Sequence, residues 1–395
     1  MKPLATRLAN FGPSVFSELT RLAAVHQAVN LGQGFPDFAP EPFMLDALRS
    51  AAAGPQQYVP PAGLLELRQA LSTFLTPSCG FAPDPETEIT VTVGATEAMH
   101  AAIQALVNPG DEVVILEPSY DMYAPQVEFA QGVVRRVALV PDEAGHWCLN
   151  LEAVRALVTP KTKALILNTP HNPTGKVFSY AELAGLAELA LEFDLYVLAD
   201  EVYSHLVYEG EHVSVASLPG MRERTVTIGS AGKLFSVTGW RVGWAVASPE
   251  VSKALRAGHT FVTFAAPTPL QVALTVALTY TQTLSVTAQT FRQRRDQLAA
   301  ALTAAGLPPY PAQGGYFLTA DVSALGQDEA EVARFLLTEG GVAALPMGVF
   351  YSEATRPLVP RLRFAFCKSG EVLDEAARRL ARVPVPSATV QVQHS

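Results

Sequence analysis

The sequence predicts an α/β protein whose larger part is a mostly parallel β-sheet with helices on both faces. Three observations lead to this prediction: a series of apolar, β-branched runs, the helical patterns between them, and a change of pattern near Ser285. Parallel strands appear as continuous apolar runs because helices cover both faces of their sheet. Active sites in such sheets lie at the carboxyl ends of the strands. Polar side chains that directly follow each strand are therefore the candidate functional residues.

The expected elements of the larger part alternate between strands and helices. Strands are expected at 88–93, 111–118, 163–170, 195–203, 225–230 and 241–248, and helices at 96–107 and 180–194. The pattern changes from about Ser285, where a long amphipathic helix at 289–306, short apolar strands and a closing helix from about Gly370 indicate a smaller α+β domain. The first forty residues are too short to fold alone and are expected to complete that domain. The expected domains are a large domain of residues 44–284, a small domain of residues 1–43 and 285–384, and a tail of residues 385–395.

Composition narrows the class of protein. Of the 395 residues, 49% are hydrophobic and 16% are charged, so the chain can bury a large core. The net charge of −9 and the scattered basic residues argue against nucleic-acid binding. No run of eighteen apolar residues is present and the first residues lack a hydrophobic signal segment, so neither a membrane span nor secretion is expected. The three cysteines are far apart, which argues against a metal site and suits a reducing cytoplasm.

Two polar features follow the first two expected strands. After 88–93, "GATEAMHAAI" places a glycine turn before a helix, where the backbone at Ala95 and Thr96 would suit a phosphate. An ordinary helix start would have the same pattern. After 111–118, Tyr120 stands at the end of the strand. Its ring could stack on a flat cofactor or simply cover the edge of the core.

The next two strands are followed by an amide and a carboxylate. Asn172, in the turn "HNPTGKVF", projects its amide from the end of 163–170. Asp200 ends a strongly apolar strand, where an unpaired carboxylate would be costly. It therefore needs a cationic partner, either an arginine or the protonated ring nitrogen of a cofactor. Tyr203 lies close enough in the chain to reach the same place.

The stretch "GSAGKLFSVTGWRVGW" places Lys233 among small and apolar residues after the strand 225–230. A desolvated lysine can form a Schiff base with a carbonyl, whereas the alternative is a lysine that only extends to solvent. Ser230 and Arg241 would suit a phosphate, one through its hydroxyl and the other through its forked charge. The glycine spacing is not that of a P-loop, and "LGQGFPD" lacks the third glycine of a dinucleotide-binding motif.

Together these features stand in chain order at successive strand ends, a combination typical of pyridoxal 5′-phosphate (PLP). The motifs "NLGQGFPDF", "VTVGATEA", "EPSYDMY", "LNTPHNPTGKVF", "DEVY", "TIGSAGKLFSVTGWRVGW" and "LRFAFCK" resemble the class I/II aminotransferases of PLP fold type I. The resemblance covers nearly the whole chain and is greatest for the kynurenine, glutamine and methionine aminotransferase-like subgroup. It implies a large domain with a mostly parallel seven-stranded sheet between helices, and a smaller α+β domain.

The resemblance also implies roles for the candidate residues. Lys233 would carry the Schiff base and move the substrate proton, and Asp200 would pair with the pyridine nitrogen. Tyr203 and Asn172 would hydrogen-bond the phenolic oxygen of the ring. The other implied cofactor contacts are Tyr120 on the ring face, Ala95, Thr96, Ser230 and Arg241 at the phosphate, and Tyr58 reaching the phosphate of the neighbouring subunit in a homodimer.

For the substrate, the resemblance implies Arg363 at the α-carboxylate, assisted by Gly34 and Asn172. In "RLRFAF", Arg361 and Arg363 share one face of the strand, so their spacing alone does not choose between them. Either would otherwise be interpreted as a solvated charge on an edge strand. The family pattern chooses Arg363. Phe16, Tyr58 and Phe264 resemble positions that line the side-chain pocket.

The implied reaction moves the α-amino group of an L-amino acid to a 2-oxo acid by a ping-pong mechanism. Methionine, aromatic amino acids, glutamine and kynurenine are the candidate donors. Ala265 stands where some kynurenine- or glutamine-type members have a histidine, so methionine and aromatic donors are preferred. The nearest alternative is a PLP-dependent cysteine-S-conjugate β-lyase. A PLP-binding regulator would need an added helix-turn-helix domain, for which the start of the chain leaves no room, and the joint presence of the site residues disfavours a degenerate homologue.

Overall fold

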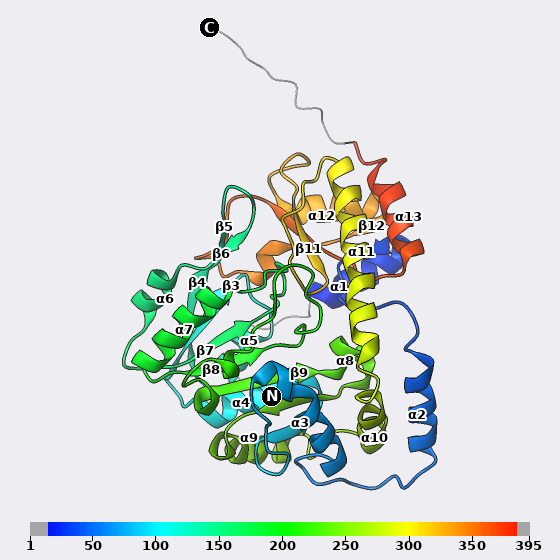
Figure 1. Cartoon of the computed structure of the whole chain (residues 1–395). Coiled ribbons are helices and arrows are strands. Elements are labelled where there is room, and N and C mark those ends of the chain that lie inside the picture. Colours follow the sequence, from blue (N-terminus) through cyan, green and yellow to red (C-terminus); the bar gives the residue numbers. More distant parts are fainter. Residues whose placement is uncertain (1–14, 385–395) are drawn as a thin grey trace, which may run out of the picture. The chain divides into compact units, whose positions relative to one another are not determined.

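The computed structural model describes residues 15–384, and the chain folds as two compact units. The large unit comprises Phe38–Thr290 and Gln313–Gly315. The small unit comprises Phe291–Ala312 and the described parts of Met1–Asp37 and Tyr316–Ser395. Figure 1 follows the elements of both units along the chain.

The large unit is built on a seven-stranded sheet. Across the sheet the strands are β2 (Ile89–Thr92), β10 (Gly243–Val246), β9 (Thr225–Ser230), β8 (Tyr196–Asp200), β7 (Thr162–Asn168), β3 (Glu112–Glu117) and β4 (Val133–Ala138). All neighbouring pairs are parallel except those of β10, which runs antiparallel to β2 and β9. The expected α/β fold with a mostly parallel seven-stranded sheet is therefore confirmed. Its seventh strand, β4, was not among the expected elements.

The strand register brings the ends of several strands to one edge of the sheet. Asn168 at the end of β7 pairs with Asp200 at the end of β8. Gly243, the first residue of β10, pairs with both Ser230 of β9 and Thr92 of β2, which are the last residues of their strands. Because β10 runs in the opposite direction, its start lies at the edge where the other strands end.

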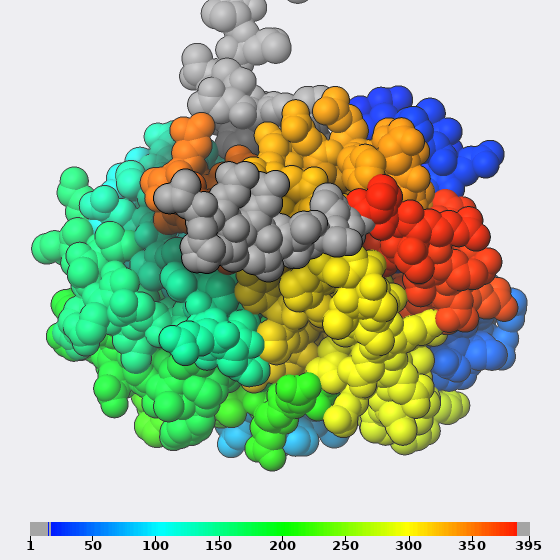
Figure 2. Space-filling model, turned by 90° about the horizontal axis from the view of Figure 1, so that it is seen from above, coloured from blue at the N-terminus to red at the C-terminus, as the bar shows by residue number. Residues whose placement is uncertain are grey.

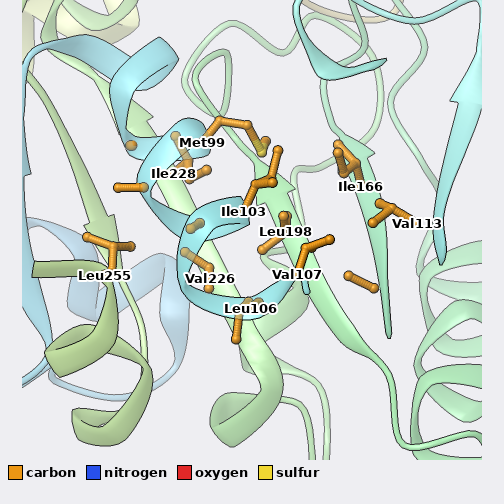
Figure 3. Packing of buried hydrophobic residues seen from close by; sticks show 14 of the residues in the cluster. Met99, Ile103, Leu106, Val107, Val113, Ile166, Leu198, Val226, Ile228 and Leu255 are labelled. Carbon is orange, nitrogen blue, oxygen red and sulfur yellow. The ribbon is translucent and has the colours of Figure 1, made fainter. Parts of the chain in front are cut away.

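Helices cover both faces of this sheet. On one face, α4 (Gly94–Leu106), α5 (Tyr123–Phe129) and α9 (Pro249–Val262) share a buried core with alternate strand residues such as Ile166 and Leu198. Figure 3 shows Met99 and Ile103 of α4 in this core. On the other face, α6 (Leu151–Leu157) and α7 (Tyr180–Glu192) pack on the intervening strand residues. Each fully buried Leu or Ile contributes about 1.5–3 kcal/mol, so packing of these two helical layers stabilises the sheet.

A third group of helices packs on the β2–β10 side of the sheet. The helices α2 (Pro42–Ala52), α3 (Leu65–Cys79) and α10 (Thr268–Ala277) share a core with β2 and β10. The short helix α8 (Ala231–Leu234) follows β9 directly, and a small hairpin of β5 (Val140–Pro141) and β6 (Trp147–Cys148) follows β4. No helix within residues 15–384 is long and apolar enough to cross a bilayer.

The small unit contains two short sheets. In one, β1 (Val29–Asn30) pairs in parallel with β12 (Val342–Ala343). In the other, β14 (Arg361–Ala365) lies between β11 (Phe317–Asp321) and β13 (Leu345–Pro346), antiparallel to both. The helices of this unit are α1 (Val15–Val25), α12 (Glu329–Thr338) and α13 (Gly370–Leu380). The described residues of the first forty thus pair with a strand near residue 342.

The long helix α11 (Gln282–Ala304) begins in the large unit and ends in the small one. Its buried residues recur at helical spacing, Leu284, Phe291, Leu298 and Leu302. Its opposite face is exposed and is visible in yellow on the face of the molecule in Figure 2. The helix starts earlier than the amphipathic pattern of residues 289–306 indicated, because its first two turns carry threonine, serine and valine rather than a clear polar stripe.

Candidate active site

Apart from Tyr58, each candidate cofactor residue lies at or shortly after the end of β2, β3, β7, β8 or β9, or just before the start of β10. Ala95 and Thr96 lie in the first turn of α4, and Tyr120 follows β3. The other candidates are Asn172 after β7, Asp200 and Tyr203 at and after β8, Ser230 and Lys233 at and after β9, and Arg241 just before β10. Since these strand ends share one edge of the sheet, the structure brings the candidates to one region of the large unit.

Asp200 is a buried carboxylate at the end of β8, with 3% of its surface exposed. Its Oδ2 accepts a hydrogen bond from the Tyr123 hydroxyl at 2.7 Å, and its Oδ1 accepts one from the Val202 amide at 3.3 Å. Burial raises the pKa of Asp200 to about 6, although the Tyr123 hydroxyl, the Val202 amide and the Lys233 charge each lower it. A cationic N–H group opposite this buried carboxylate would favour its ionised form.

Tyr123 and Asn168 are site residues that the sequence interpretation missed. Tyr123 is buried, and burial followed by the negative charge of Asp200 raises the pKa of its hydroxyl well above the usual value. This hydroxyl therefore stays protonated and donates to Asp200. The Asn168 amide donates to the Asp200 carbonyl at 2.9 Å, and its oxygen accepts from the Asn172 backbone N–H at 2.6 Å. The signal for Tyr123 was present in "SYDMY", which holds two tyrosines rather than one.

Lys233 lies in α8 and is partly buried. Its Nζ is 5.7 Å from the centre of the Tyr203 ring, and its charge acts on Asp200. Tyr203 is itself buried, with 3% of its surface exposed. The Lys233 amine, the Tyr203 phenol and the Asp200 carboxylate therefore lie near one another at the ends of β8 and β9. Tyr120 packs edge-to-face on Tyr123, with 5.9 Å between ring centres, so it lies beside the Asp200 cluster.

The turn at Gly94–Thr96, here called the phosphate turn, is packed tightly against Arg241. Gly94 has φ +78°, and a Cβ at this position would lie 2.6 Å from Nη2 of Arg241. A Cβ on Gly243 would lie 2.6 Å from the Gly94 carbonyl carbon and 2.7 Å from the Ala95 nitrogen. Both glycines are therefore required by the close approach of backbone and guanidinium. Gln126 of α5 fixes the same turn by donating to the Thr96 carbonyl at 3.0 Å.

Arg241 adopts the left-handed backbone conformation, with φ +53° and ψ +44°. This conformation is uncommon for a residue other than glycine and is found at functional sites. It turns the chain into β10 while the guanidinium stays at the phosphate turn, where Nη1 also donates to the Thr238 carbonyl at 3.3 Å. Ser230 is buried at the end of β9, and its Oγ would lie 3.3 Å from a Cβ on Gly232.

These features fit PLP. The backbone N–H groups in the first turn of α4, together with Arg241 and Ser230, would form a cradle for a phosphate dianion. The buried Asp200 carboxylate matches a protonated ring nitrogen, and Lys233 provides an amine beside it. No group of three or more His, Cys, Asp or Glu side chains within the described residues could hold a metal ion.

Tyr58 and Phe264 lie together on the outside of the large unit. Their ring centres are 5.4 Å apart in an edge-to-face arrangement, and 88% of Tyr58 and 42% of Phe264 are exposed. Phe264 has φ +67°, and its backbone N–H donates to the His259 carbonyl at 3.3 Å. The side chain of Phe16, in α1, lies outside the part of the molecule that the structure describes.

In the small unit, Arg363 of β14 is buried, with 1% of its surface exposed. Its guanidinium carbon lies 4.0 Å from the centre of the Phe317 ring, and Nη2 donates to the Gly32 carbonyl at 2.8 Å. Gly34 contacts the same phenylalanine, since a Cβ there would lie 2.4 Å from Phe317 Cζ. The structure therefore brings Gly34 and Arg363 to one aromatic ring.

The alternative interpretation of Arg361 and Arg363 as solvated charges on an edge strand is wrong. β14 is the central strand of its sheet, and both arginines are buried. Their surroundings differ, because Arg361 donates through Nε to the Tyr310 hydroxyl at 2.9 Å and stacks on the Tyr310 ring. Arg363 instead lies between two phenylalanines, Phe317 and Phe350. Arg361 is engaged by this tyrosine, whereas Arg363 is the arginine that shares the Phe317 ring with Gly34.

Comparison with known proteins identifies relatives along the whole chain. The family model "Aminotransferase class I and II" matches residues 26–380. A probable N-succinyldiaminopimelate aminotransferase from Mycobacterium tuberculosis is 44% identical over 97% of this chain and 99% of its own. A methionine aminotransferase from Escherichia coli is 39% identical over 96% of this chain and 98% of its own.

Solved structures give the same result. The structure of N-succinyldiaminopimelate aminotransferase from Mycobacterium tuberculosis matches with a TM-score of 0.93, covering 96% of this chain and 99% of that chain at 44% identity. A Thermus thermophilus aspartate aminotransferase variant matches with a TM-score of 0.89 at 37% identity, covering 97% of this chain and 100% of that chain. Aminotransferases that are named for different substrates therefore share this fold.

Proposed function

Because the chain belongs to the class I and II aminotransferases, and is therefore a PLP-dependent transaminase of fold type I, we propose that its amino donor is L-methionine or an aromatic amino acid. The acceptor is a 2-oxo acid and the two half-reactions follow in ping-pong order. The observation that carries this proposal is the pair of aromatic rings, Tyr58 and Phe264, next to Ala265. Such a wall suits an apolar or aromatic side chain and offers no charge to a polar one.

The large unit would hold the cofactor through the residues at the sheet edge. When bound, PLP supplies an aldehyde carbon that joins amino groups and a protonated ring that withdraws electrons. Asp200 would keep that ring protonated, since a cationic N–H opposite a buried carboxylate stabilises both charges. The phosphate turn, Ser230 and Arg241 would bind the phosphate. Tyr203 and Asn172 would orient the ring through its phenolic oxygen, and Tyr120 would contact its face.

Lys233 would serve both as the attachment point and as the base of the reaction. Its Nζ would accept the proton from the substrate Cα and release it again in the same half-reaction. The Tyr203 ring, whose centre is 5.7 Å from Nζ, would cover one side of the amine. In the small unit, Arg363 would bind the substrate α-carboxylate through its forked N–H groups, with Gly34 assisting from its position against the same Phe317 ring.

A second donor is supported by the comparison itself. The relative that is 44% identical is named a probable N-succinyldiaminopimelate aminotransferase, so the corresponding N-succinyl amino acid is an alternative substrate. Its succinyl carboxylate would need a cation or several N–H donors at the far end of the pocket. Tyr58, Phe264 and Ala265 supply neither, which is why methionine and aromatic donors are proposed first. The β-lyase alternative has no support from the relatives described above, which are named as transaminases.

We further propose that the protein is a cytoplasmic homodimer with shared active sites. Phe261 is 92% exposed and Tyr58 is 88% exposed, and both lie near Phe264 in the chain or in space. Large apolar side chains exposed together indicate a protein interface. Tyr58 would then reach the phosphate bound by the partner subunit. The cytoplasmic assignment rests on the three cysteines, Cys79, Cys148 and Cys367, none of which forms a disulfide.

The domain organisation that we propose has a large domain at residues 44–284 and a small domain at residues 1–43 and 285–384. The compact units of the chain divide at Asp37 and within α11 at Phe291, a few residues from these boundaries. The large domain would bind the cofactor, and the small domain would supply Arg363.

The testing experiment is a donor series on the purified holoenzyme. The cofactor absorbance is followed during single half-reactions with L-methionine, L-phenylalanine, L-kynurenine, L-glutamine and N-succinyl-diaminopimelate, and rate constants are compared per unit concentration. Methionine or phenylalanine should be fastest. A preference of tenfold or more for the N-succinyl substrate would replace the proposed donor. Release of pyruvate from a β-substituted cysteine without an acceptor would support the lyase. Light scattering on the same sample should give the mass of two chains.

A further inference from the structure

A buried pair, Glu97 and His259, joins the phosphate turn to the surface that carries Tyr58. Glu97 is the fourth residue of α4, and its Oε2 accepts a hydrogen bond from the Val93 backbone N–H at 2.7 Å. The carboxylate therefore lies directly behind the phosphate turn and fixes the residue that precedes Gly94. Only 8% of Glu97 is exposed, so this acid is held inside the protein.

The second oxygen of Glu97 reaches the last turn of α9. Oε1 lies 2.5 Å from Nδ1 of His259 and accepts a hydrogen bond from the Thr263 hydroxyl at 3.1 Å. His259 is completely buried, and its other ring nitrogen, Nε2, lies 2.9 Å from the Pro61 carbonyl oxygen. A carbonyl only accepts, so Nε2 carries a proton and donates it. The imidazole ring thus spans from Glu97 to the loop that follows Tyr58.

Residues 57–64 and 261–268, here called the aromatic arm, are braced to each other. The Thr268 hydroxyl donates to the Gln57 carbonyl at 2.7 Å. The buried Gln271 accepts from the Leu64 backbone N–H at 2.8 Å and donates to the Ala266 carbonyl at 2.7 Å. The aromatic arm carries the exposed rings of Tyr58, Phe261 and Phe264. Because of these braces, a displacement of Pro61 or of Thr263 moves both parts of the arm.

We propose that Glu97 and His259 are positioning residues that couple anion binding at the phosphate turn to the conformation of the aromatic arm. The pair contacts Val93, which directly precedes the phosphate turn, and contacts the arm at Pro61 and Thr263, so a shift at either end is transmitted through two buried side chains. Binding of PLP phosphate orders the turn, and the pair orders the arm with it. By reciprocity, an ordered arm strengthens phosphate binding by the same factor.

This coupling, which for its effect on catalysis rests on the proposed homodimer, would connect the two active sites. The aromatic arm of one subunit would supply Tyr58 and Phe264 to the site of its partner. Cofactor binding in the first subunit would then prepare the side-chain pocket of the second. The ligand class that drives the change is a phosphate monoester dianion, here the phosphate of PLP itself.

The test is hydrogen exchange of the full chain, measured by mass spectrometry with and without PLP. In the wild-type protein, PLP should slow exchange in 57–64 and 261–268 by about 5- to 150-fold, the usual range of coupling between two sites. In His259→Phe, which keeps a ring but removes both hydrogen bonds, PLP should still protect residues 92–98 and should leave the arm unchanged. Thr260→Val is the matched control, because it removes only the hydrogen bond to the Arg256 carbonyl within α9 and leaves Glu97, His259 and the braces of the arm intact. It should keep the PLP-dependent protection of the arm.

Two further variants separate coupling from a merely structural role. His259→Gln can still reach Pro61 but not Glu97, and His259→Asn can reach Glu97 but not Pro61. Both variants should lose the PLP-dependent protection of the arm, since the coupling requires the contact with Glu97 and the contact with Pro61 together. If His259→Phe does not fold, Glu97→Gln and Thr263→Val weaken the same link and should each reduce the protection at least about fivefold, the lower end of the range for coupled sites.

Two results would overturn the proposal: equal protection of the arm in wild-type and all His259 variants, or no protection of the arm in the wild type. Failure of the homodimer is recognised separately by mass. A single-chain mass with PLP-dependent arm protection that is lost in His259→Phe keeps the coupling and removes only its link between sites. A two-chain mass with unchanged arm protection in the variants removes the coupling and keeps the homodimer.

Discussion

The hydroxyl of Tyr123 donates a hydrogen bond of 2.7 Å to Oδ2 of Asp200, and both side chains are buried. Tyr123 begins α5 and Asp200 ends β8, so the contact joins a helix on one face of the sheet to the sheet edge. The hydroxyl favours the ionised carboxylate, which is the form that a cationic ring would need.

Removing this hydroxyl in Tyr123→Phe should weaken PLP binding. A hydrogen bond to a charged group contributes about 1.5–3 kcal/mol, so the dissociation constant of PLP should rise about 10- to 100-fold. Titration of the apoprotein followed by cofactor absorbance measures it. Tyr120→Phe is the matched control, because it keeps a ring near the same site and does not touch Asp200. Equal PLP affinities in the two variants would contradict this role of Tyr123.

The raised pKa of Asp200 predicts a pH-dependent stability of the apoprotein. Its pKa is about 6 in the folded protein against 3.8 in the unfolded chain, so the folded state holds the proton more tightly. This contribution is fully present below pH 3.8 and is lost as the pH rises through 6. At about 1.4 kcal/mol per pKa unit, the loss is about 3 kcal/mol.

Asp200→Asn should lack that loss, because its amide does not titrate. The free energy of unfolding in urea, measured for both apoproteins between about pH 4 and pH 7, should change in favour of the variant by about 2.4 kcal/mol over this interval. Other titrating groups contribute equally to both proteins and cancel in the difference. Parallel curves for the two proteins would show that Asp200 is not responsible.

A matched pair of glycine variants tests the phosphate turn. Gly94→Ala and Gly110→Ala both place alanine at positive φ, +78° and +86°, and should each cost about 1–2 kcal/mol of stability. A Cβ at Gly94 would collide with Arg241, whereas nothing lies within 4 Å of a Cβ at Gly110. Only Gly94→Ala should therefore lose PLP affinity. A comparable loss in Gly110→Ala would mean that backbone strain, and not the cradle, is responsible.

A second pair of variants tests the choice between Arg363 and Arg361. Arg363→Lys should raise KM for the amino donor about 10- to 100-fold, because lysine replaces a forked contact with a single charge. Arg361→Lys loses its contact with Tyr310 and should lower stability while leaving KM within about twofold, as for a side chain with a structural role. Steady-state kinetics with thermal melts distinguish the two. A larger rise of KM in Arg361→Lys would reverse the assignment.

Lys233→Ala should abolish transamination while the protein stays folded, because no other amine within the described residues acts on Asp200 in the same way. Lys253→Ala, at an exposed position of α9, is the control and should behave as the wild type. Turnover with methionine and the absorbance of the bound cofactor are the two measurements. Near-normal turnover of Lys233→Ala would exclude Lys233 as the attachment point and the base.

The parts of the fold that could be predicted are those with a continuous apolar pattern. Six strands of the large sheet appear in the sequence as such runs, because helices bury both of their faces. The strand β4 was missed because Arg135 and Arg136 interrupt its pattern, and they are tolerated there because the strand lies at an edge of the sheet and its arginines pair with Glu112 and Glu117. The pattern of single residues does not encode such long-range partners.

In the candidate site, too, the residues that could be predicted are those that stand out in the local sequence pattern. Lys233, Asp200 and Arg241 could be found because each places a charge directly beside an apolar strand. Tyr123 was missed because its role depends on a hydrogen bond to the carboxylate of Asp200, which lies 77 residues away in the sequence. The choice of Arg363 over Arg361 came from the family pattern alone, because their difference depends on Tyr310 and Phe317, which lie on other segments. Partners distant in sequence are thus what the sequence interpretation lacked.

The antiparallel strand β10 has a consequence for how the site assembles during folding. Lys233 and Arg241 are separated by only seven residues and meet the sheet through neighbouring antiparallel strands. Bringing them together closes a short loop, which costs little chain entropy. Asp200 and Asn172 instead depend on parallel strands joined by helical crossovers, which form through contacts distant in sequence. We therefore expect the local contacts that place Lys233 and Arg241 to form before the contacts, distant in sequence, that place Asp200 and Asn172.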